Sequence, residues 1–341
     1  MLKITKLKII NKINKNKISR LAYSFNFLTN YIGLIFILII FSFFSIKRIE
    51  NNSNFLIWDE CVYLQYAKEM KKNNNFLTYT WNDEFILYKP TLYGIILQIP
   101  YSIMGINSQG AQFLSLFFSL FIIILLYFFS IKFFNIKTAL IASLILLKSK
   151  TFIEFSTKVI TDIPFTFFIF LGFIFGILNK KNFFIIAALC FAIATLIKGL
   201  SSIFFIAPLI LILLFEDSKE KWKKLTSFLL IFVSLTLPWH LIQLIIYKKE
   251  FINKYFYDSL FFRATKNIHF QSDVFFYINL IWQDIFPVGI ILSVDLLLKF
   301  KNLFRKKIQP QLLIIIKIKK ILNSRKNSNK LLIKKIFIFS F

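Results

Sequence analysis

The chain has 341 residues, of which 57% are hydrophobic and 19% aromatic, and its formal net charge at pH 7 is +27. This hydrophobic content exceeds the roughly one half that is usual in soluble domains, and it lies in blocks of membrane-spanning length, so the sequence predicts an integral membrane protein. The charge does not indicate nucleic-acid binding, because the first twenty residues hold seven Lys and Arg and residues 299–335 hold thirteen, without any acidic residue in either stretch. Basic flanks of this kind are typical of cytoplasmic segments of membrane proteins.

Eight apolar segments are expected to cross the membrane, since a helical crossing needs about 17–25 residues and shorter helices fit within a bundle. A further apolar segment, 92–104, contains Gln98 and Pro100 and is expected to be interfacial or re-entrant. The predicted fold is an all-α, polytopic helix bundle with interfacial helices in the first outer loop. Its parts are a basic cytoplasmic tail (1–24), a membrane core (25–298) and a basic tail (299–341). The predicted crossings are 25–46, 110–131, 138–155, 163–178, 183–197, 200–215, 225–247 and 274–298.

A cytoplasmic N-terminus places 28 of the 43 Lys and Arg residues on the inner side, twenty of them in the two tails, together with only three acidic residues. The outer side then holds 15 basic and 12 acidic residues, and this asymmetry agrees with the positive-inside rule. The same orientation gathers ionisable residues from four loops or helix ends on the outer face. Such groups at a membrane boundary are costly and often functional, so the outer face is predicted to carry the site. These residues are Asp59, Glu60, Lys89, Asp162, Lys198, Arg263, Lys266 and His269.

The segment WDECVYLQYAKEM, residues 58–70, places Asp59 and Glu60 at the start of an expected interfacial helix. The positive end of the helix dipole keeps a carboxylate there ionised, and an ionised carboxylate can act as a general base toward a hydroxyl. The alternative is that Asp59 only caps the helix, because Asp is a favoured N-cap residue.

Two further loops bring a cation and an acid to the same face. Pro90 biases Lys89 toward an extended backbone, which could hold its ammonium near a lipid phosphate; the alternative is a snorkelling interfacial lysine. In TDIP, Asp162 precedes Pro164 at the start of an expected helix. Asp162 is therefore either a cap or an acid that faces a cavity.

The remaining outer-face residues are cationic or can become so. Lys198 and Gly199 lie at an expected reversal between two short crossings, where a lone lysine is costly unless it reaches water or an anion. Arg263 could bind a phosphate with two parallel hydrogen bonds. Lys266 and His269 follow in the same loop, and His269 by itself indicates nothing, because surface histidines are common. The sequence contains no Walker loop, GxGxxG, HExxH or EF-hand pattern.

The order of these motifs resembles the bacterial branch of the protein O-mannosyltransferase family, which includes the aminoarabinose-to-lipid A transferases. These are cell-envelope glycosyltransferases of the GT-C class that use polyprenyl-phosphate sugars. The resemblance extends over residues 31–298. Its ordered signals are WDECVYLQYA, YKPTLYGIILQIPYSIMGINSQGAQFLSLFFSL, TDIPFTFFIFLG, ATLIKGLSSIFFIAPL, and LPWHLIQLIIYKKEFINKYFYDSLFFRAT with FFYINLIWQDIFP.

The resemblance implies a role for each matching position. Asp59 corresponds to the acid that deprotonates the acceptor hydroxyl, Glu60 to the second residue of the same pair, and Asp162 to the second functional acid. All three are expected to be catalytic. The expected phosphate-binding residues are Lys89, Lys198 and Arg263, and the expected further contacts to donor or acceptor are Lys266, His269 and Tyr63.

The chain also departs from the family pattern. Thr91 replaces the second proline of the KPP motif, and Tyr88 stands where some relatives carry a metal-ligating glutamate, so no metal site is predicted and a divalent cation is left open. Relatives usually continue through further crossings, whereas the region after Asp295 becomes lysine-rich without membrane periodicity. We therefore expect a C-terminally truncated transferase core.

The resulting expectation is an inverting glycosyltransferase of the plasma (inner) membrane, with its N-terminus in the cytoplasm and an extracytoplasmic active site. It would move a sugar from a polyprenyl phosphate to a hydroxyl of a protein, lipid A-like or glycan acceptor, and it would bind no nucleic acid. The alternatives are a multi-spanning transporter or lipid-sugar flippase, an inactive truncated transferase, and a non-catalytic scaffold, for which Asp59→Asn would leave the phenotype intact. Transporters usually show internal repeats with broken helices in matching halves, and the sequence shows no such repeat.

Overall fold

The structure is a computed structural model of a chain that divides into two compact units, 1–278 and 279–341. It describes residues 31–51, 57–178, 181–214 and 220–262 of the first unit, and 279, 282–284 and 286 of the second. In the second unit, the backbone N–H of Phe286 donates to the Trp282 carbonyl at 2.8 Å and closes one helical turn. The features below all belong to the first unit.

The segment after the first described helix, Tyr31–Asn51, folds into two helices and a small hairpin. Its elements are α2 (Trp58–Asn73), β1 (Tyr79–Trp81), β2 (Glu84–Ile86) and α3 (Leu92–Met104). The antiparallel hairpin was not predicted from the sequence, although its turn residues Asn82 and Asp83, with φ of 50° and 68°, are those that a two-residue type I′ turn favours. The Tyr101 hydroxyl of α3 donates to the Leu64 carbonyl of α2 at 3.2 Å, so the two helices of this loop pack together.

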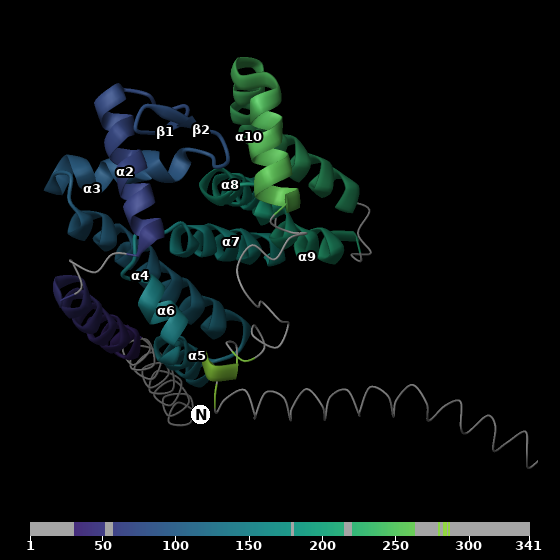
Figure 1. Cartoon of the computed structure of the whole chain (residues 1–341). Coiled ribbons are helices and arrows are strands. Elements are labelled where there is room, and N and C mark those ends of the chain that lie inside the picture. The colour runs from purple at the N-terminus through teal and green to yellow at the C-terminus, as the bar shows by residue number, and fades with distance from the viewer. Residues whose placement is uncertain are drawn as a thin grey trace, which may run out of the picture. The chain divides into compact units, whose positions relative to one another are not determined.

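Helices make up the rest of the described unit (Figure 1). They are α4 (Ser108–Phe133), α5 (Ile136–Lys148), α6 (Lys150–Phe155), α7 (Asp162–Ile177), α8 (Lys181–Lys198), the short η1 (Leu200–Ser202), α9 (Ile203–Leu214), α10 (Lys221–Phe251) and the π-helical η2 (Ile252–Phe262). The expected single helix 138–155 is divided at Ser149, because the Ser149 hydroxyl accepts the Phe152 N–H at 3.1 Å and caps a new helix.

Helix α7 joins the two main hydrophobic clusters of the unit. Phe165 and Ile169 pack in the cluster formed with α2, α3 and α8, whereas Ile163 packs in the cluster formed with the first helix, α4 and α5. In Figure 1, α7 accordingly lies between α2, α3 and the hairpin on one side and the α4–α6 group on the other. Its first residue, Asp162, is therefore held by packing on both sides.

The chain reverses direction near the end of α10. Lys248 has φ 48° and ψ −122° inside the element, which separates two helical arms. The arms contact each other, since the ring of Trp239 lies 5.9 Å from that of Phe251 and the ring of His240 lies 5.2 Å from that of Tyr255. This reversal brings η2 back alongside α10.

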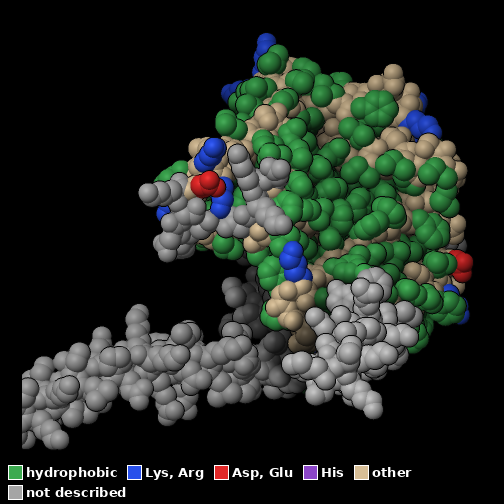
Figure 2. All heavy atoms as spheres, turned by 180° about the vertical axis from the view of Figure 1, so that it is seen from behind, with side chains coloured by type: hydrophobic (Ala, Val, Ile, Leu, Met, Phe, Trp, Pro, Cys, Tyr) green, Lys and Arg blue, Asp and Glu red, His purple; other side chains and the backbone are tan. Residues whose placement is uncertain are grey.

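Apolar helices identify the protein as a multi-pass membrane protein. Within the described residues, three helical stretches are long and apolar enough to cross a membrane: Tyr31–Asn51, Ser108–Phe133 and Lys221–Ser259, the last of which includes the reversal at Lys248. The 26 residues of α4 correspond to about 39 Å, more than the roughly 30 Å of a bilayer core. Figure 2 shows a broad hydrophobic face with charged side chains mostly at its margins. The predicted all-α polytopic fold is confirmed, and the predicted crossing 274–298 lies largely outside the described residues.

Candidate active site

A cavity of about 370 Å³ lies where the start of α2, the segment after β2, the start of α7, the end of α8 and η2 meet. It collects four of the charged residues that the sequence predicts on the outer face. The lining residues are Asp59, Tyr63, Tyr88, Lys89, Ile160, Thr161, Asp162, Lys198, Gly199, Leu200, Tyr255 and Ser259. Two acids and two lysines from four separate stretches of sequence therefore share one space.

Asp59 lies in the first turn of α2 and its side chain is exposed to the cavity. The helix begins at Trp58, so Asp59 is not the N-cap residue. The carboxylate of the next residue performs the capping instead, because Glu60 Oε2 accepts the backbone N–H of Ile57 at 3.1 Å. Asp59 consequently combines a position at the positive end of a helix with access to the cavity.

Glu60 is 1% exposed and is not among the lining residues. Its Oε1 accepts the N–H of Val159 at 2.9 Å, across 99 positions of sequence. Buried backbone N–H groups almost always need a partner, and here Glu60 supplies one for the loop that leads to Asp162. The contact ties the start of α2 to the start of α7.

Lys89 and Tyr63 form one wall of the cavity. The Lys89 ammonium donates to the Tyr63 hydroxyl at 2.8 Å and lies 4.5 Å from the centre of the Tyr63 ring. Burial raises the pKa of Tyr63 above its usual range, so the phenol stays protonated. Pro90, next to the lysine, lies 3.7 Å from the position that a Cβ on Gly199 would take. The backbone next to Lys89 therefore packs close to the turn that follows Lys198.

Asp162 and Lys198 form an ion pair that also lines the cavity. Their Oδ1 and Nζ atoms are 2.7 Å apart, and about a third of each side chain is exposed. Lys198 is the last residue of α8, and Gly199 follows with φ +87°, a conformation that only glycine adopts without strain. A Cβ at Gly199 would also lie 3.4 Å from the Tyr255 hydroxyl. The sharp turn therefore depends on glycine.

The residues that η2 contributes to the cavity, Tyr255 and Ser259, were not predicted from the sequence. Tyr255 lines the cavity, and its hydroxyl lies 2.9 Å from His240 Nε2. His240 Nδ1 lies 2.8 Å from the Thr236 carbonyl, which can only accept, so Nδ1 carries the proton. In the neutral ring Nε2 is then the acceptor, and the Tyr255 hydroxyl donates to it. Only the reversal at Lys248 brings these residues together, and no proline or glycine in that stretch signals it.

Tyr88 was considered in the sequence analysis only as a departure from a family motif, yet it lines the cavity as well. Its hydroxyl lies 2.6 Å from the Tyr66 hydroxyl of α2. The aromatic positions of the predicted amphipathic helix could have signalled this wall, because Tyr63 and Tyr66 lie three residues apart and therefore on neighbouring positions of one helix face.

Three predicted site residues, Arg263, Lys266 and His269, lie outside the described residues. Across the part of the chain that the structure does describe, no group of three or more His, Cys, Asp or Glu side chains is placed to hold a metal ion.

Comparison with known proteins supports the family assignment. Residues 88–242 match the family model of the dolichyl-phosphate-mannose-protein mannosyltransferases. A curated but uncharacterized protein of Aquifex aeolicus is 30% identical over 232 residues, which cover 65% of this chain and 45% of that protein. The predicted resemblance to the protein O-mannosyltransferase family is thereby confirmed.

Two solved structures share the fold. ArnT from Cupriavidus metallidurans bound to undecaprenyl phosphate superposes with a TM-score of 0.64 at 17% identity, covering 75% of this chain and 48% of ArnT. The apo form of the same protein gives 0.61 at 18% identity, covering 75% and 49%. The fold is therefore of the GT-C type, and this chain spans about half the length of the relatives it matches.

Proposed function

We propose that this chain, which resembles the protein O-mannosyltransferases and has an ArnT-like fold, is a membrane glycosyltransferase that moves a sugar from a polyprenyl phosphate to an acceptor hydroxyl. The observation that carries the proposal is the cavity in which Asp59, Lys89, Asp162 and Lys198 meet. The cavity offers carboxylates for proton transfer and ammonium groups for a phosphate. The undecaprenyl phosphate bound to ArnT supports a lipid-phosphate donor.

Asp59 acts as the general base in this proposal. It takes the proton of the acceptor hydroxyl while that oxygen attacks the anomeric carbon, and the bond from that carbon to the phosphate oxygen breaks on the opposite face. The single displacement inverts the anomeric centre, and the electron pair of the broken bond stays with the polyprenyl phosphate. A second carboxylate acting as nucleophile, as in retaining glycosidases, is not required.

Lys89 and Lys198 stabilise the negative charge that grows on the leaving phosphate. Cations fixed in place before the reaction stabilise such charge most effectively, and Tyr63 and the Gly199 turn hold these two. Asp162 orients the Lys198 ammonium through their ion pair. Arg263 is proposed as a third phosphate ligand, and Lys266 and His269 as contacts to donor or acceptor.

Glu60 is proposed to position Asp59 rather than to react. Its two hydrogen bonds to the backbone at Ile57 and Val159 hold the start of α2 in register with the loop before Asp162. The resulting cavity would open to the extracytoplasmic side of the inner membrane, with the N-terminus in the cytoplasm. The acceptor hydroxyl would belong to a protein, a lipid A-like molecule or a glycan.

The proposal is tested by transfer of label from radiolabelled polyprenyl-phosphate sugars. Membranes that contain the wild type or the Asp59→Asn variant are incubated with each donor, and label is followed into lipid, protein and glycan fractions. Loss of a general base is expected to reduce transfer about 10²–10⁴-fold. Absence of Asp59-dependent transfer from every donor would contradict the proposal.

A matched control is Asp83→Asn. Asp83 lies in the hairpin turn of the same outer loop, is exposed, and does not line the cavity. It should leave transfer unchanged, which separates the loss of a reactive carboxylate from a general loss of negative charge in the loop.

A further inference from the structure

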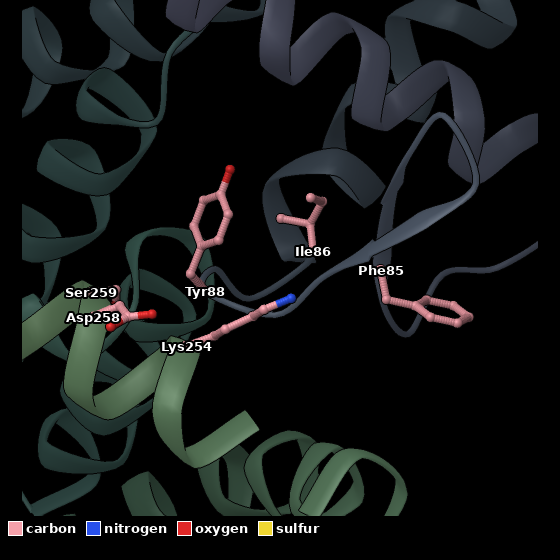
Figure 3. A pocket seen from close by; sticks show the side chains of 6 residues that line it. All are labelled: Phe85, Ile86, Tyr88, Lys254, Asp258 and Ser259. Carbon is pink, nitrogen blue, oxygen red and sulfur yellow. The ribbon is translucent and has the colours of Figure 1, made fainter. Parts of the chain in front are cut away.

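A second cavity of about 220 Å³ adjoins the first between the hairpin and η2 (Figure 3). Phe85, Ile86, Tyr88, Lys254, Asp258 and Ser259 line it. Tyr88 and Ser259 also line the larger cavity. A molecule in the second cavity is therefore next to the space that contains Asp59.

The polar groups of this cavity come from one face of η2. Figure 3 shows the Asp258 carboxylate and the Lys254 side chain extending from η2 into the space between it and the hairpin. The Lys254 ammonium also contacts Glu250 at 2.8 Å. No described residue forms an ion pair or hydrogen bond with the Asp258 carboxylate, so its oxygens are available as acceptors.

The opposite side of the cavity is apolar. The ring of Tyr88 rises from the segment after β2 with its hydroxyl directed away from Asp258 (Figure 3), toward the Tyr66 hydroxyl. Its ring and Ile86 therefore offer carbon surface rather than hydrogen-bonding groups. A sugar ring fits this arrangement, because one of its faces carries C–H groups that pack against apolar side chains and its edge carries hydroxyls that hydrogen-bond.

From this arrangement we propose that the second cavity is a subsite for one neutral sugar residue of the acceptor. Asp258 accepts hydrogen bonds from sugar hydroxyls, the Lys254 ammonium donates to a hydroxyl or ring oxygen, and the Tyr88 ring covers the C–H face. The inference rests on the proposed transferase function, because it makes this sugar a part of the molecule whose hydroxyl reaches Asp59.

Charge and size both favour a neutral, single-ring ligand. One acidic and one basic side chain line the space, so a ligand that is strongly charged with either sign is repelled by one of them. The volume of about 220 Å³ lies below the range of about 300–1,000 Å³ that is usual for drug-sized ligands. The cavity therefore has room for one ring, and the remainder of an acceptor would extend outward or into the larger cavity.

The test is equilibrium dialysis of the purified full chain in detergent. The probes are tritiated neutral trisaccharides built from glucose, mannose or N-acetylglucosamine, with spermidine and inorganic phosphate as charged comparisons. We expect at least one trisaccharide to bind. Asp258→Asn and Lys254→Gln should each weaken that binding about tenfold or more, because each removes a charged hydrogen-bonding partner.

Glu250→Gln is the matched control, because it breaks the same pair with Lys254 from a residue that does not line the cavity. It should bind the trisaccharide as the wild type does. Ile86→Trp, which fills the cavity, should abolish binding; if this variant fails to fold, Asp258→Asn still decides, because Asp258 is exposed on η2.

The possible failures can be told apart. Absence of trisaccharide binding to the wild type, or binding that Asp258→Asn leaves unchanged, overturns the subsite. Binding of spermidine or phosphate alone, dependent on Asp258 or Lys254, also overturns it in favour of an ion site. Asp59→Asn should still bind the trisaccharide, because Asp59 does not line the second cavity. If the trisaccharide binds but no Asp59-dependent transfer is found, the sugar-binding subsite stands and the proposed transferase function is wrong.

Discussion

Replacing Glu60 tests whether its carboxylate takes part in the reaction or only positions Asp59. In Glu60→Gln, the amide oxygen can accept only one of the two backbone N–H groups that the carboxylate accepts now. We expect the Val159 N–H to keep this bond, because it is fully buried, and the exposed Ile57 to turn its N–H toward water. The folded state then loses about 1–2 kcal/mol, the range for one charged hydrogen bond with partial solvent compensation.

Glu60→Ala leaves the Val159 N–H without a partner and also removes buried atoms. An unsatisfied buried group costs about 1–3 kcal/mol, and the lost second bond adds about 1 kcal/mol. We therefore expect a destabilisation of about 2–4 kcal/mol. The measurement is thermal and denaturant unfolding of the purified chain in detergent, followed by tryptophan fluorescence.

Transfer activity provides the second readout. Glu60→Gln should reduce transfer by no more than about tenfold. Asp59 can still accept the proton of the acceptor hydroxyl, and only one of the two hydrogen bonds that position the start of α2 is lost. The acidic limb of the pH–rate profile should remain, because it reports the base itself. A loss as large as that of Asp59→Asn without a change in unfolding, or the disappearance of that limb, would refute the positioning role.

Three further variants test other parts of the site. Gly199→Ala should destabilise the folded state by about 1–3 kcal/mol and reduce transfer. Gly105 also has a positive φ, +77°, but no atom lies within 4 Å of the position of its Cβ, so Gly105→Ala should lower stability without reducing transfer. Equal transfer in the two variants would contradict a role for the turn at Gly199. Burial raises the pKa of Glu69, but its hydrogen bonds lower it by more, so its pKa is lower in the folded chain than in the unfolded chain. The ionised carboxylate therefore stabilises the folded state fully above its unfolded pKa of about 4.3, and this stabilisation is lost as the pH falls through the folded pKa. Unfolding scans from pH 7 to pH 3 should therefore show a smaller loss for Glu69→Gln than for the wild type, and parallel curves would disprove this. His240→Phe and Tyr255→Phe should each reduce stability by about 1 kcal/mol without adding in the double variant; additive effects would show that the two rings act independently.

The charged residues of the cavity could be predicted to meet because membrane topology fixes the side on which each loop lies. Once alternate loops are assigned to one face, Asp59, Lys89, Asp162 and Lys198 must share it, whatever the packing of the helices. Membrane topology does not distinguish Asp59 from Glu60, because these two carboxylates are adjacent in one loop. Successive residues point about 100° apart on a helix, and only the packing of α2 decides which one faces the cavity.

The contribution of η2 could not be predicted for a different reason. The reversal at Lys248 is set in a run of ordinary helix formers, and its backbone strain is compensated by contacts such as that between His240 and Tyr255. Long-range packing of this kind leaves no local pattern. The hairpin, in contrast, had a readable signal at Asn82 and Asp83.

The reversal at Lys248 also constrains how this wall of the cavity can change in evolution. Tyr255, Asp258 and Ser259 all follow it on one helical arm, so inserting or deleting a single residue between Lys248 and Tyr255 would rotate all three about the axis of that arm at once. New substrate preferences can therefore arise here by exchanging side chains, whereas a change in the length of this short connection would dismantle both cavities together.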